Sequence, residues 1–123
     1  MKSSLGNIPD SIAARVLELS GQPSVRAADT ISEKAFMAAV IAEAKRNGWR
    51  VYHTHDSRKS EAGFPDLLLL RHTRIMVAEL KVGDNKPTAA QLNWLEAFGD
   101  ATVEWHVWRP DQWAEIVERL ATK

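Results

Sequence analysis

The spacing of hydrophobic residues along the chain changes from helical to strand-like and back again, and it predicts elements in a definite order. Apolar residues recur every three or four positions after residue 30, which predicts an amphipathic helix over 30–47. Asn47 and Gly48 end this pattern with residues that favour helix termination. Thr30 and Glu33 match a capping box, so Thr30 is the predicted N-cap.

Two apolar runs in the middle of the chain predict a β-hairpin. Leucines fill positions 67–70, and a second apolar run covers 75–78. Continuous apolar runs of this length are typical of strands that are buried on both faces of a sheet. The polar break at 71–74 is short, so we expect a tight turn to join the two strands.

The remaining pattern completes an α/β domain. Three successive strands predict an antiparallel meander, and a crossover helix makes the fourth strand parallel to the third. Helices are then expected on both faces of a mixed four-stranded sheet. Residues 1–29 are predicted to hold a short N-terminal helix and a linker, ahead of one domain over 30–123. The other predicted elements are a strand over 49–54, a loop over 82–87, a helix over 88–98 stopped by Gly99, a strand over 101–108 and a terminal helix from Trp113 to Leu120.

Charged residues stand at the ends of the two central strands, where an apolar hairpin needs none. Asp66 precedes the leucine strand, and Glu79 and Lys81 end the next one. The start of one strand lies beside the end of its antiparallel neighbour, so we expect Asp66 close to Glu79. Residues two apart on a strand point to one face, which places Lys81 beside Glu79. Two carboxylates and an ammonium are therefore predicted to meet at one rim of the sheet, with Asp66 and Lys81 outside the hydrophobic interior.

This acidic rim suits a divalent cation. Two adjacent carboxylates repel each other at neutral pH unless a cation lies between them. The chain has no cysteine, and carboxylate oxygens favour a hard ion, so Mg²⁺ is the predicted cofactor, with Mn²⁺ as a substitute. Asp66, Glu79 and the Leu80 carbonyl oxygen are the predicted ligands, while Lys81 could position a water or stabilise charge on a phosphate oxygen. The alternative is an ion pair between Glu79 and Lys81, with Asp66 in a turn.

The residues around this rim resemble a known signature. Gly63-Phe64-Pro65-Asp66, an apolar strand and Ala78-Glu79-Leu80-Lys81 are similar to the motif of the PD-(D/E)XK nucleases. The glycine before Pro-Asp, with Thr88 and Gln91 downstream, resembles their VRR-NUC branch, the virus-type replication and repair nucleases. These occur as small stand-alone phage proteins and as domains of larger DNA-repair enzymes. The resemblance covers about residues 32–108 and implies a restriction-endonuclease-like αβββαβ core.

The resemblance also gives roles to two residues that have a structural explanation of their own. Glu33 corresponds to the helix glutamate that assists metal binding, directly or through water, although a capping box explains it as well. Gln91 forms a second capping box with Thr88, yet an amide also suits the orientation of water or a phosphate oxygen. The candidate catalytic residues are therefore Glu33, Asp66, Glu79, Lys81 and Gln91, and Glu33 is also a candidate metal-binding group.

The distribution of charge favours a nucleic-acid substrate more than the net charge does. The formal net charge is zero, which argues against a protein that coats nucleic acid through bulk charge. Residues 45–86 hold nine Lys or Arg against five Asp or Glu, whereas residues 87–123 hold three against six. The basic middle of the chain suits phosphate contacts. The predicted DNA-binding residues are His55, Arg58, Lys59 and Lys86.

Composition places the chain in a broad class. Its 123 residues are 45% hydrophobic and 26% charged, which suits one globular domain with a modest core. The sequence has no apolar run long enough for a membrane span, and residues 1–10 do not resemble a secretion signal. With the resemblance, these features predict a cytoplasmic protein of phage or bacterial type that has no membrane partner.

Together these features predict a Mg²⁺-dependent, structure-specific DNA endonuclease that hydrolyses phosphodiester bonds. The resemblance implies branched DNA, such as four-way (Holliday) junctions, as the substrate, and a homodimer that supplies two sites for two strands. The alternatives are an endonuclease for linear duplex or flap DNA, a DNA-binding module without turnover, and a protein-interaction subunit. The last would use an aromatic corner of Trp105, Trp108 and Trp113, which otherwise belongs to the core or a subunit interface.

Overall fold

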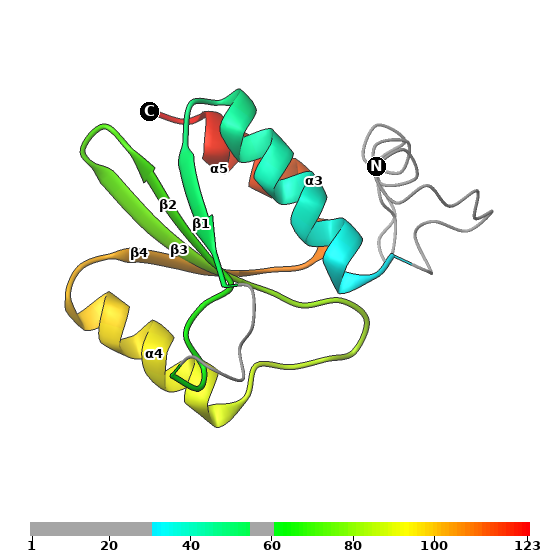
Figure 1. The fold of residues 1–123 in the computed structure, drawn as a ribbon, viewed down its shortest axis with the longest axis vertical. Coiled ribbons are helices and arrows are strands. Elements are labelled where there is room, and N and C mark those ends of the chain that lie inside the picture. The colour runs from blue at the N-terminus through cyan, green and yellow to red at the C-terminus, as the bar shows by residue number, and fades with distance from the viewer. Residues whose placement is uncertain (1–30, 55–60) are drawn as a thin grey trace.

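A computed structural model describes residues 31–54 and 61–123 of the chain, and Figure 1 shows their arrangement. The elements follow the predicted order of helix, three strands, helix, strand and helix. The prediction of a helix and linker in residues 1–29 lies outside the described residues. The elements are α3 (Glu33–Arg46), β1 (Arg50–His53), β2 (Leu67–Arg71), β3 (Arg74–Leu80), α4 (Ala89–Asp100), β4 (Glu104–Trp108), the 3-10 turn η2 (Pro110–Gln112) and α5 (Trp113–Ala121).

The sheet has the predicted mixed topology. Its strands lie in the order β1-β2-β3-β4, with antiparallel pairing between the first three and parallel pairing between β3 and β4. The parallel pair requires a crossover connection, which α4 supplies. Figure 1 shows α3 and α5 on one face of the sheet and α4 on the other. The predicted α/β architecture is therefore confirmed.

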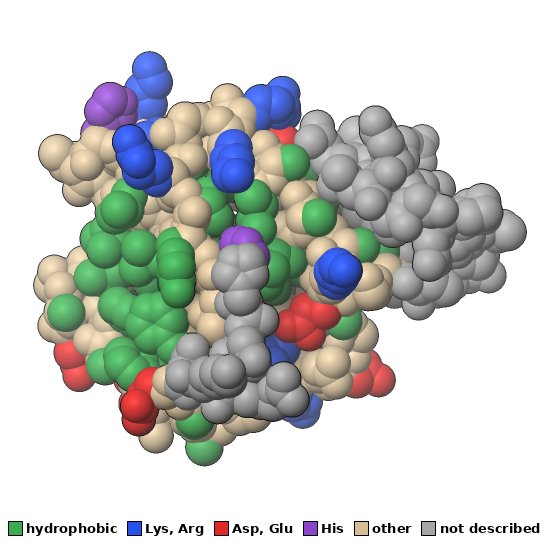
Figure 2. Space-filling model, viewed as in Figure 1, with side chains coloured by type: hydrophobic (Ala, Val, Ile, Leu, Met, Phe, Trp, Pro, Cys, Tyr) green, Lys and Arg blue, Asp and Glu red, His purple; other side chains and the backbone are tan. Residues whose placement is uncertain are grey.

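The main core lies between the sheet and the pair α3 and α5. Alternate residues of the hairpin point into it, and the stripe of α3 that includes Phe36 and Val40 covers them. The prediction that both hairpin strands are buried on both faces is wrong at the turn end, where Leu70 is 41% exposed and Ile75 is 38% exposed. The reason is that α4 packs mainly on β4 and β3 and leaves part of this face uncovered. Figure 2 shows hydrophobic side chains at the surface between the hairpin and α4.

The beginning of α3 differs from the prediction. Ser32, not Thr30, is the N-cap: its hydroxyl oxygen accepts a hydrogen bond from the Ala35 N–H at 3.0 Å. Glu33 is therefore the first residue of the helix and not the third position of a capping box. A carboxylate in the first turn is still favourable there because of the helix dipole.

The boundaries of α4 and β4 also differ in detail. Thr88 caps α4 as predicted, but the helix continues through Gly99 to Asp100. Strand β4 then begins at Glu104 and not at residue 101, since Thr102 has a positive φ of 63° that interrupts the extended backbone. None of the helices in the described part of the chain is long and apolar enough to cross a membrane.

The predicted aromatic corner is only partly right. Trp108 and Trp113 are buried in the core, as expected for core residues. Trp105 is 40% exposed. It lies three residues before Trp108 on β4, so the two side chains point to opposite faces of the sheet. The three tryptophans therefore do not form one surface for a partner.

Candidate active site

The hairpin register brings the two predicted carboxylates together. Leu67 pairs with Ala78, so the next positions outward, Asp66 and Glu79, stand opposite each other on the sheet face that also carries α4. One carboxylate oxygen of Asp66 accepts a hydrogen bond from the Leu80 N–H at 2.8 Å. The N–H and C=O of a strand residue face the same neighbour, so the Leu80 carbonyl faces this side as well.

Glu79 is a buried carboxylate at the rim of the sheet. Its side chain is 1% exposed, and neither oxygen has a hydrogen-bond partner among the described residues. The Lys81 ammonium lies 3.4 Å from Oε2, close enough for an ion pair but without hydrogen-bond geometry. Lys81 itself is 9% exposed, so the expectation that it lies outside the interior is wrong, whereas Asp66 is half-buried. Leaving a buried carboxylate unsatisfied costs free energy, so this carboxylate requires an explanation.

Burial and neighbouring charges shift the pKa of Glu79. Burial, followed by the nearby charge of Asp66, raises the pKa of Glu79 to about 7, although Lys81 opposes the shift. Without a cation this carboxyl is thus partly protonated near neutral pH. A bound divalent ion would restore its charged form, which is the expected behaviour of a metal ligand.

Glu33 joins the same group from the first turn of α3. Burial is the main cause that raises its pKa above the ordinary glutamate value. The Asp66 carboxylate adds to this rise, and the Lys81 ammonium opposes it. Because these charges act on one another, Glu33 lies near the pair from the hairpin. The predicted grouping of Glu33, Asp66, Glu79 and Lys81 is therefore present in the fold.

A cavity of about 440 Å³ opens over Glu33, Asp66 and Glu79. Its walls come from the start of α3, the end of β1, the turn before β2 and the first turn of α4. A cavity of this size is large enough for a phosphodiester group with its water. The polar side chains that line it are Glu33, Thr54, Glu61, Asp66, Glu79, Thr88 and Gln91.

Gln91 has the structural role that the sequence suggests. The side-chain oxygen of Gln91 accepts a hydrogen bond from the Thr88 backbone N–H at 2.8 Å. The backbone N–H of Gln91 donates to the Thr88 hydroxyl oxygen at 3.2 Å. The capping box fixes the amide group at the cavity wall. Its side-chain nitrogen is a donor that can still serve a phosphate oxygen or a water.

The turn before Asp66 requires glycine at position 63. Gly63 has a φ of 91°, and a Cβ on it would lie 2.6 Å from the backbone carbonyl of Ala90 in α4. Beside it, the Trp94 indole N–H donates to the Ala62 carbonyl at 3.0 Å, and Phe64 packs edge-on against Trp94. This close approach explains physically why glycine precedes Pro-Asp, and it joins the acidic rim to α4 and Gln91.

The residues present fit a magnesium ion. The described residues contain no group of three or more His, Cys, Asp or Glu side chains arranged to hold a metal. Mg²⁺ does not require one, since it usually binds one or two carboxylates and keeps several waters. Asp66 and the two unpartnered oxygens of Glu79 provide such a pair. The Glu79 carboxylate, which has no hydrogen-bond partner among the described residues, is the observation that is compatible with a cation here.

The predicted DNA-binding residues are only partly visible. Lys86 is exposed in the loop that connects β3 to α4. His55, Arg58 and Lys59 lie outside the described residues. Sequence reasoning missed Arg109, which holds this loop by donating to the carbonyls of Gly83 at 3.1 Å and Asn85 at 2.7 Å. No local pattern marks such a contact, because its partners are backbone atoms 24 or more residues away.

Comparison with known proteins supports the fold. No family model matches the sequence, and no curated protein matches it either. Among solved structures, a chain described as "VRR_NUC domain" superposes with a TM-score of 0.59 and 24% identity, covering 70% of this chain and 94% of that chain. At this identity the likeness establishes the fold and not the chemistry. The chain therefore has the restriction-endonuclease-like α/β fold of a VRR_NUC domain.

Proposed function

We propose that this chain is a Mg²⁺-dependent endonuclease that hydrolyses phosphodiester bonds in DNA. The observation that carries the proposal is the buried Glu79 carboxylate beside Asp66 and Lys81, because within residues 31–54 and 61–123 its two oxygens have no hydrogen-bond partner. A fold similar to that of a VRR_NUC domain supports the same class of reaction. A structural ion pair alone would leave both of these oxygens unsatisfied at a cost in stability.

Each residue of the site has a separate role in the proposed hydrolysis. Asp66 and Glu79 would hold the ion, with the Leu80 carbonyl as a further ligand. When bound, Mg²⁺ would acidify a water and neutralise charge on the phosphate. Lys81, placed beside Glu79, would orient the attacking water as an ammonium or, in its neutral amine form, take up the proton of that water. The water oxygen forms a bond to phosphorus as the bond to the leaving oxygen breaks in line, so no covalent enzyme intermediate is needed.

Two further residues support this centre. Glu33 shares the electrostatic environment of Asp66 and Lys81, and it would orient a water of the site or support a second ion. Gln91 is fixed by its capping box at the cavity wall, where its amide nitrogen would hold a phosphate oxygen. Neither group needs to bond the metal directly for these roles.

Branched DNA, such as a four-way junction, is the substrate that we propose, with a homodimer as the active form. The support is the resemblance in the sequence and the need for two sites to cut two strands. Linear duplex or flap DNA is the competing substrate within the same reaction class.

A magnesium titration of cleavage tests this function. The substrates are four-way, flap, single-stranded and linear DNAs of equal length. Asp66→Asn and Lys81→Ala should lose cleavage, whereas Asp84→Asn, the same change at an exposed position, should not. Unfolding midpoints of each variant separate lost chemistry from lost structure. Full activity of the Asp66 variant, or equal cleavage of all substrates, would contradict the metal site or the branched preference, respectively.

One observation favours a second candidate, a DNA-binding module without turnover. The described residues lack a group of three side-chain ligands. Binding that survives chelation, with no cleavage in Mg²⁺ or Mn²⁺, would favour this candidate. Cleavage that stops on chelation would exclude it.

A further inference from the structure

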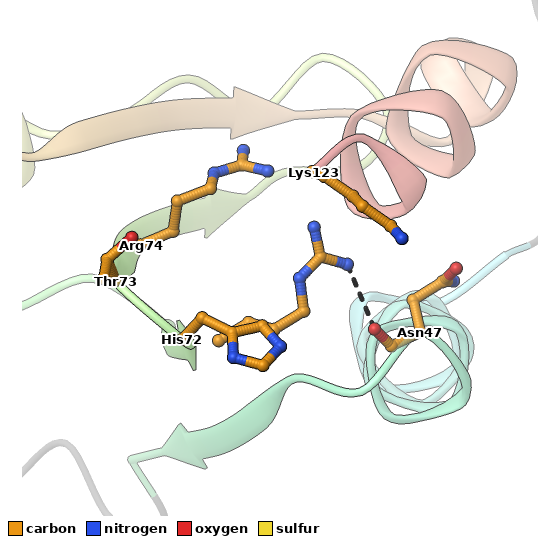
Figure 3. A pocket seen from close by; sticks show the side chains of 6 residues that line it. Asn47, His72, Thr73, Arg74 and Lys123 are labelled. Atoms are coloured by element: carbon orange, nitrogen blue, oxygen red, sulfur yellow. Dashed lines mark hydrogen bonds between the residues drawn. The ribbon is translucent and has the colours of Figure 1, made fainter.

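A second cavity lies at the opposite end of the sheet from the acidic centre. It has a volume of about 480 Å³ and is lined by Arg71, His72, Thr73, Arg74, Lys123 and Asn47 (Figure 3). The first four residues form the turn between β2 and β3. Arg71 lies five positions after Asp66 along β2, which is about 17 Å at the usual rise of a strand. None of these side chains takes part in the proposed hydrolysis.

Arg71 keeps its positive charge in this cavity. Its guanidinium donates to the carbonyl oxygens of Asn47 at 3.0 Å and Leu120 at 2.8 Å, and also to that of Thr122. The group lies 4.6 Å from the centre of the Trp49 ring. Carbonyl oxygens and an aromatic ring hold the group rigidly without neutralising it. Among the described residues, no carboxylate pairs with Arg71.

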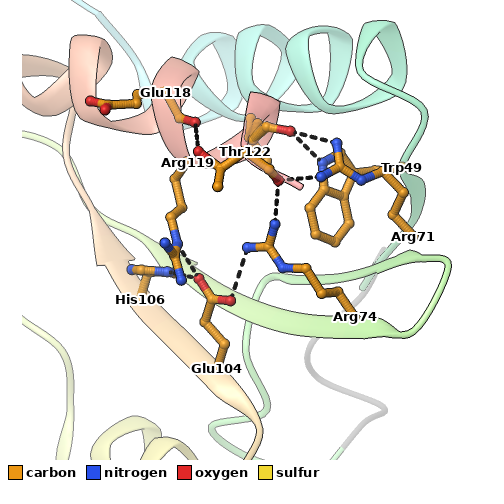
Figure 4. A network of polar contacts seen from close by, with 9 residues as sticks. Trp49, Arg71, Arg74, Glu104, His106, Glu118, Arg119 and Thr122 are labelled. Atoms are coloured by element: carbon orange, nitrogen blue, oxygen red, sulfur yellow. Dashed lines mark hydrogen bonds and ion pairs between the residues drawn. The ribbon is translucent and has the colours of Figure 1, made fainter.

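The neighbouring cations share one carboxylate (Figure 4). Glu104 pairs with Arg74 at 3.0 Å and with Arg119 at 2.5 Å, and His106 lies 2.7 Å from it. Burial opposes the charge of Glu104, but hydrogen bonds from these three groups outweigh it and lower its pKa to about 2. Glu104 is thus fully ionised, yet it balances only one of the two arginines. Figure 2 shows Lys, Arg and His side chains at the end of the molecule where the β2–β3 turn lies.

The turn itself carries backbone strain. His72 has a positive φ of 55°, a left-handed conformation that glycine or asparagine adopts more easily. A histidine in this position is held at a cost of about 1 kcal/mol or more. The exposed His72 ring lies at the cavity in Figure 3. Strain of this kind is more common where a side chain contacts a ligand.

We propose that this basic turn binds a backbone phosphate of DNA at a distance from the bond that is cut. The inference rests on the proposed function for the identity of the ligand. Arg71 and Arg74 supply a fixed positive field, because their hydrogen bonds to the protein already hold them in place. His72 and Lys123 are the groups that can donate to a phosphate oxygen. At 3.4 Å per base pair, the separation of the two sites spans about five base pairs.

The geometry makes DNA length the decisive variable. A short duplex that ends within about three base pairs of the scissile phosphate cannot reach the turn, whereas one that extends about ten base pairs can. Thr73→Glu places a carboxylate at the cavity and leaves both arginines in the sequence. Thr73→Gln is the matched variant without the charge. Both substitutions are at an exposed residue. Affinity is measured for both DNAs over a range of salt concentrations.

The Thr73→Glu variant should bind the long DNA about tenfold more weakly than the Thr73→Gln variant. The slope of its log binding constant against log salt concentration should be smaller in magnitude by about 1. The two variants should bind and cleave the short DNA alike. His72→Gly should also weaken binding of the long DNA while raising the unfolding midpoint by a few degrees, because it removes backbone strain.

Three outcomes overturn the inference: equal affinity of both Thr73 variants for the long DNA, equal losses on short and long DNA, or tight binding of the long DNA by the His72 variant. These outcomes are distinct from failure of the nuclease function. If no DNA is cut but the length-dependent loss appears, the phosphate site stands and the hydrolysis does not. If cleavage occurs without the length effect, the reverse holds.

Discussion

Glu79→Gln is expected to stabilise the metal-free protein at neutral and alkaline pH, although it removes a central side chain of the candidate active site. The folded protein raises the pKa of Glu79 from 4.5 to about 7 through burial and the Asp66 charge. Between these two values the folded state binds more protons than the unfolded state, so stability falls as pH rises. Glutamine has nearly the same shape but cannot ionise, so the stability of the variant does not fall with pH for this reason.

The magnitude follows from the linkage between pKa and stability. Each unit of pKa difference corresponds to about 1.4 kcal/mol, so ionisation of Glu79 costs about 2 kcal/mol near pH 6 and about 3 kcal/mol near pH 8. Below about pH 4.5 the carboxyl is protonated in both states, and the two proteins should differ little. The attraction of Lys81 for the ionised carboxylate is already contained in the pKa of about 7, because Lys81 is one of the groups that lower it.

Urea unfolding at several pH values, with chelator present, measures this difference. The stability of Glu79→Gln relative to wild type should grow from near zero at low pH to roughly 3 kcal/mol. Magnesium should then stabilise the wild type at alkaline pH and leave the variant unchanged. A wild type that is more stable than Glu79→Gln at alkaline pH without metal would refute the reasoning, since Glu79 would then be satisfied by the protein itself.

Three further predictions concern other parts of the site. Gly63→Ala should destabilise the protein by about 2 kcal/mol or more and lower cleavage, because the new Cβ meets the Ala90 carbonyl at a positive φ; thermal unfolding near wild type would argue against the close approach. Glu104→Gln should reduce stability at neutral pH and flatten the loss of stability between about pH 4.5 and pH 2, where the lowered pKa makes wild type acid-sensitive; acid titration of both proteins checks this, and parallel curves would disprove it. Gln91→Glu should keep the capping box with Thr88, and hence the unfolding midpoint, but lower cleavage by repelling phosphate; unchanged cleavage would leave Gln91 with a capping role only.

The sequence predicts the order of elements and the meeting of Asp66 with Glu79 because both depend on local pattern. Apolar runs define the hairpin strands, a short polar break fixes their antiparallel register, and the register brings the strand ends together. No local pattern places Glu33 beside this pair, since it comes from a helix more than 30 residues earlier in the chain. The family resemblance predicts this grouping, and the effect of the Asp66 charge on the pKa of Glu33 supports it.

What sequence patterns could not provide are the contacts made across long separations. The burial of Glu79 depends on how α4 closes over one face of the sheet, and no local pattern measures that. Glu104 and Arg119 are 15 residues apart, and Arg71 reaches Leu120 across 49 residues. Helix boundaries fail for a different reason, since Thr30 and Ser32 are both good N-caps and only the backbone conformation chooses between them.

Single-turnover cleavage of a four-way DNA junction as a function of Mg²⁺ concentration, for wild type and Glu79→Gln side by side, tests the metal centre most directly. The wild-type rate should rise with Mg²⁺ and reach a plateau, while the folded variant should be slower by about a hundredfold or more. Equal rates for the two proteins, or wild-type cleavage that persists in chelator, would contradict a magnesium site built on Asp66 and Glu79.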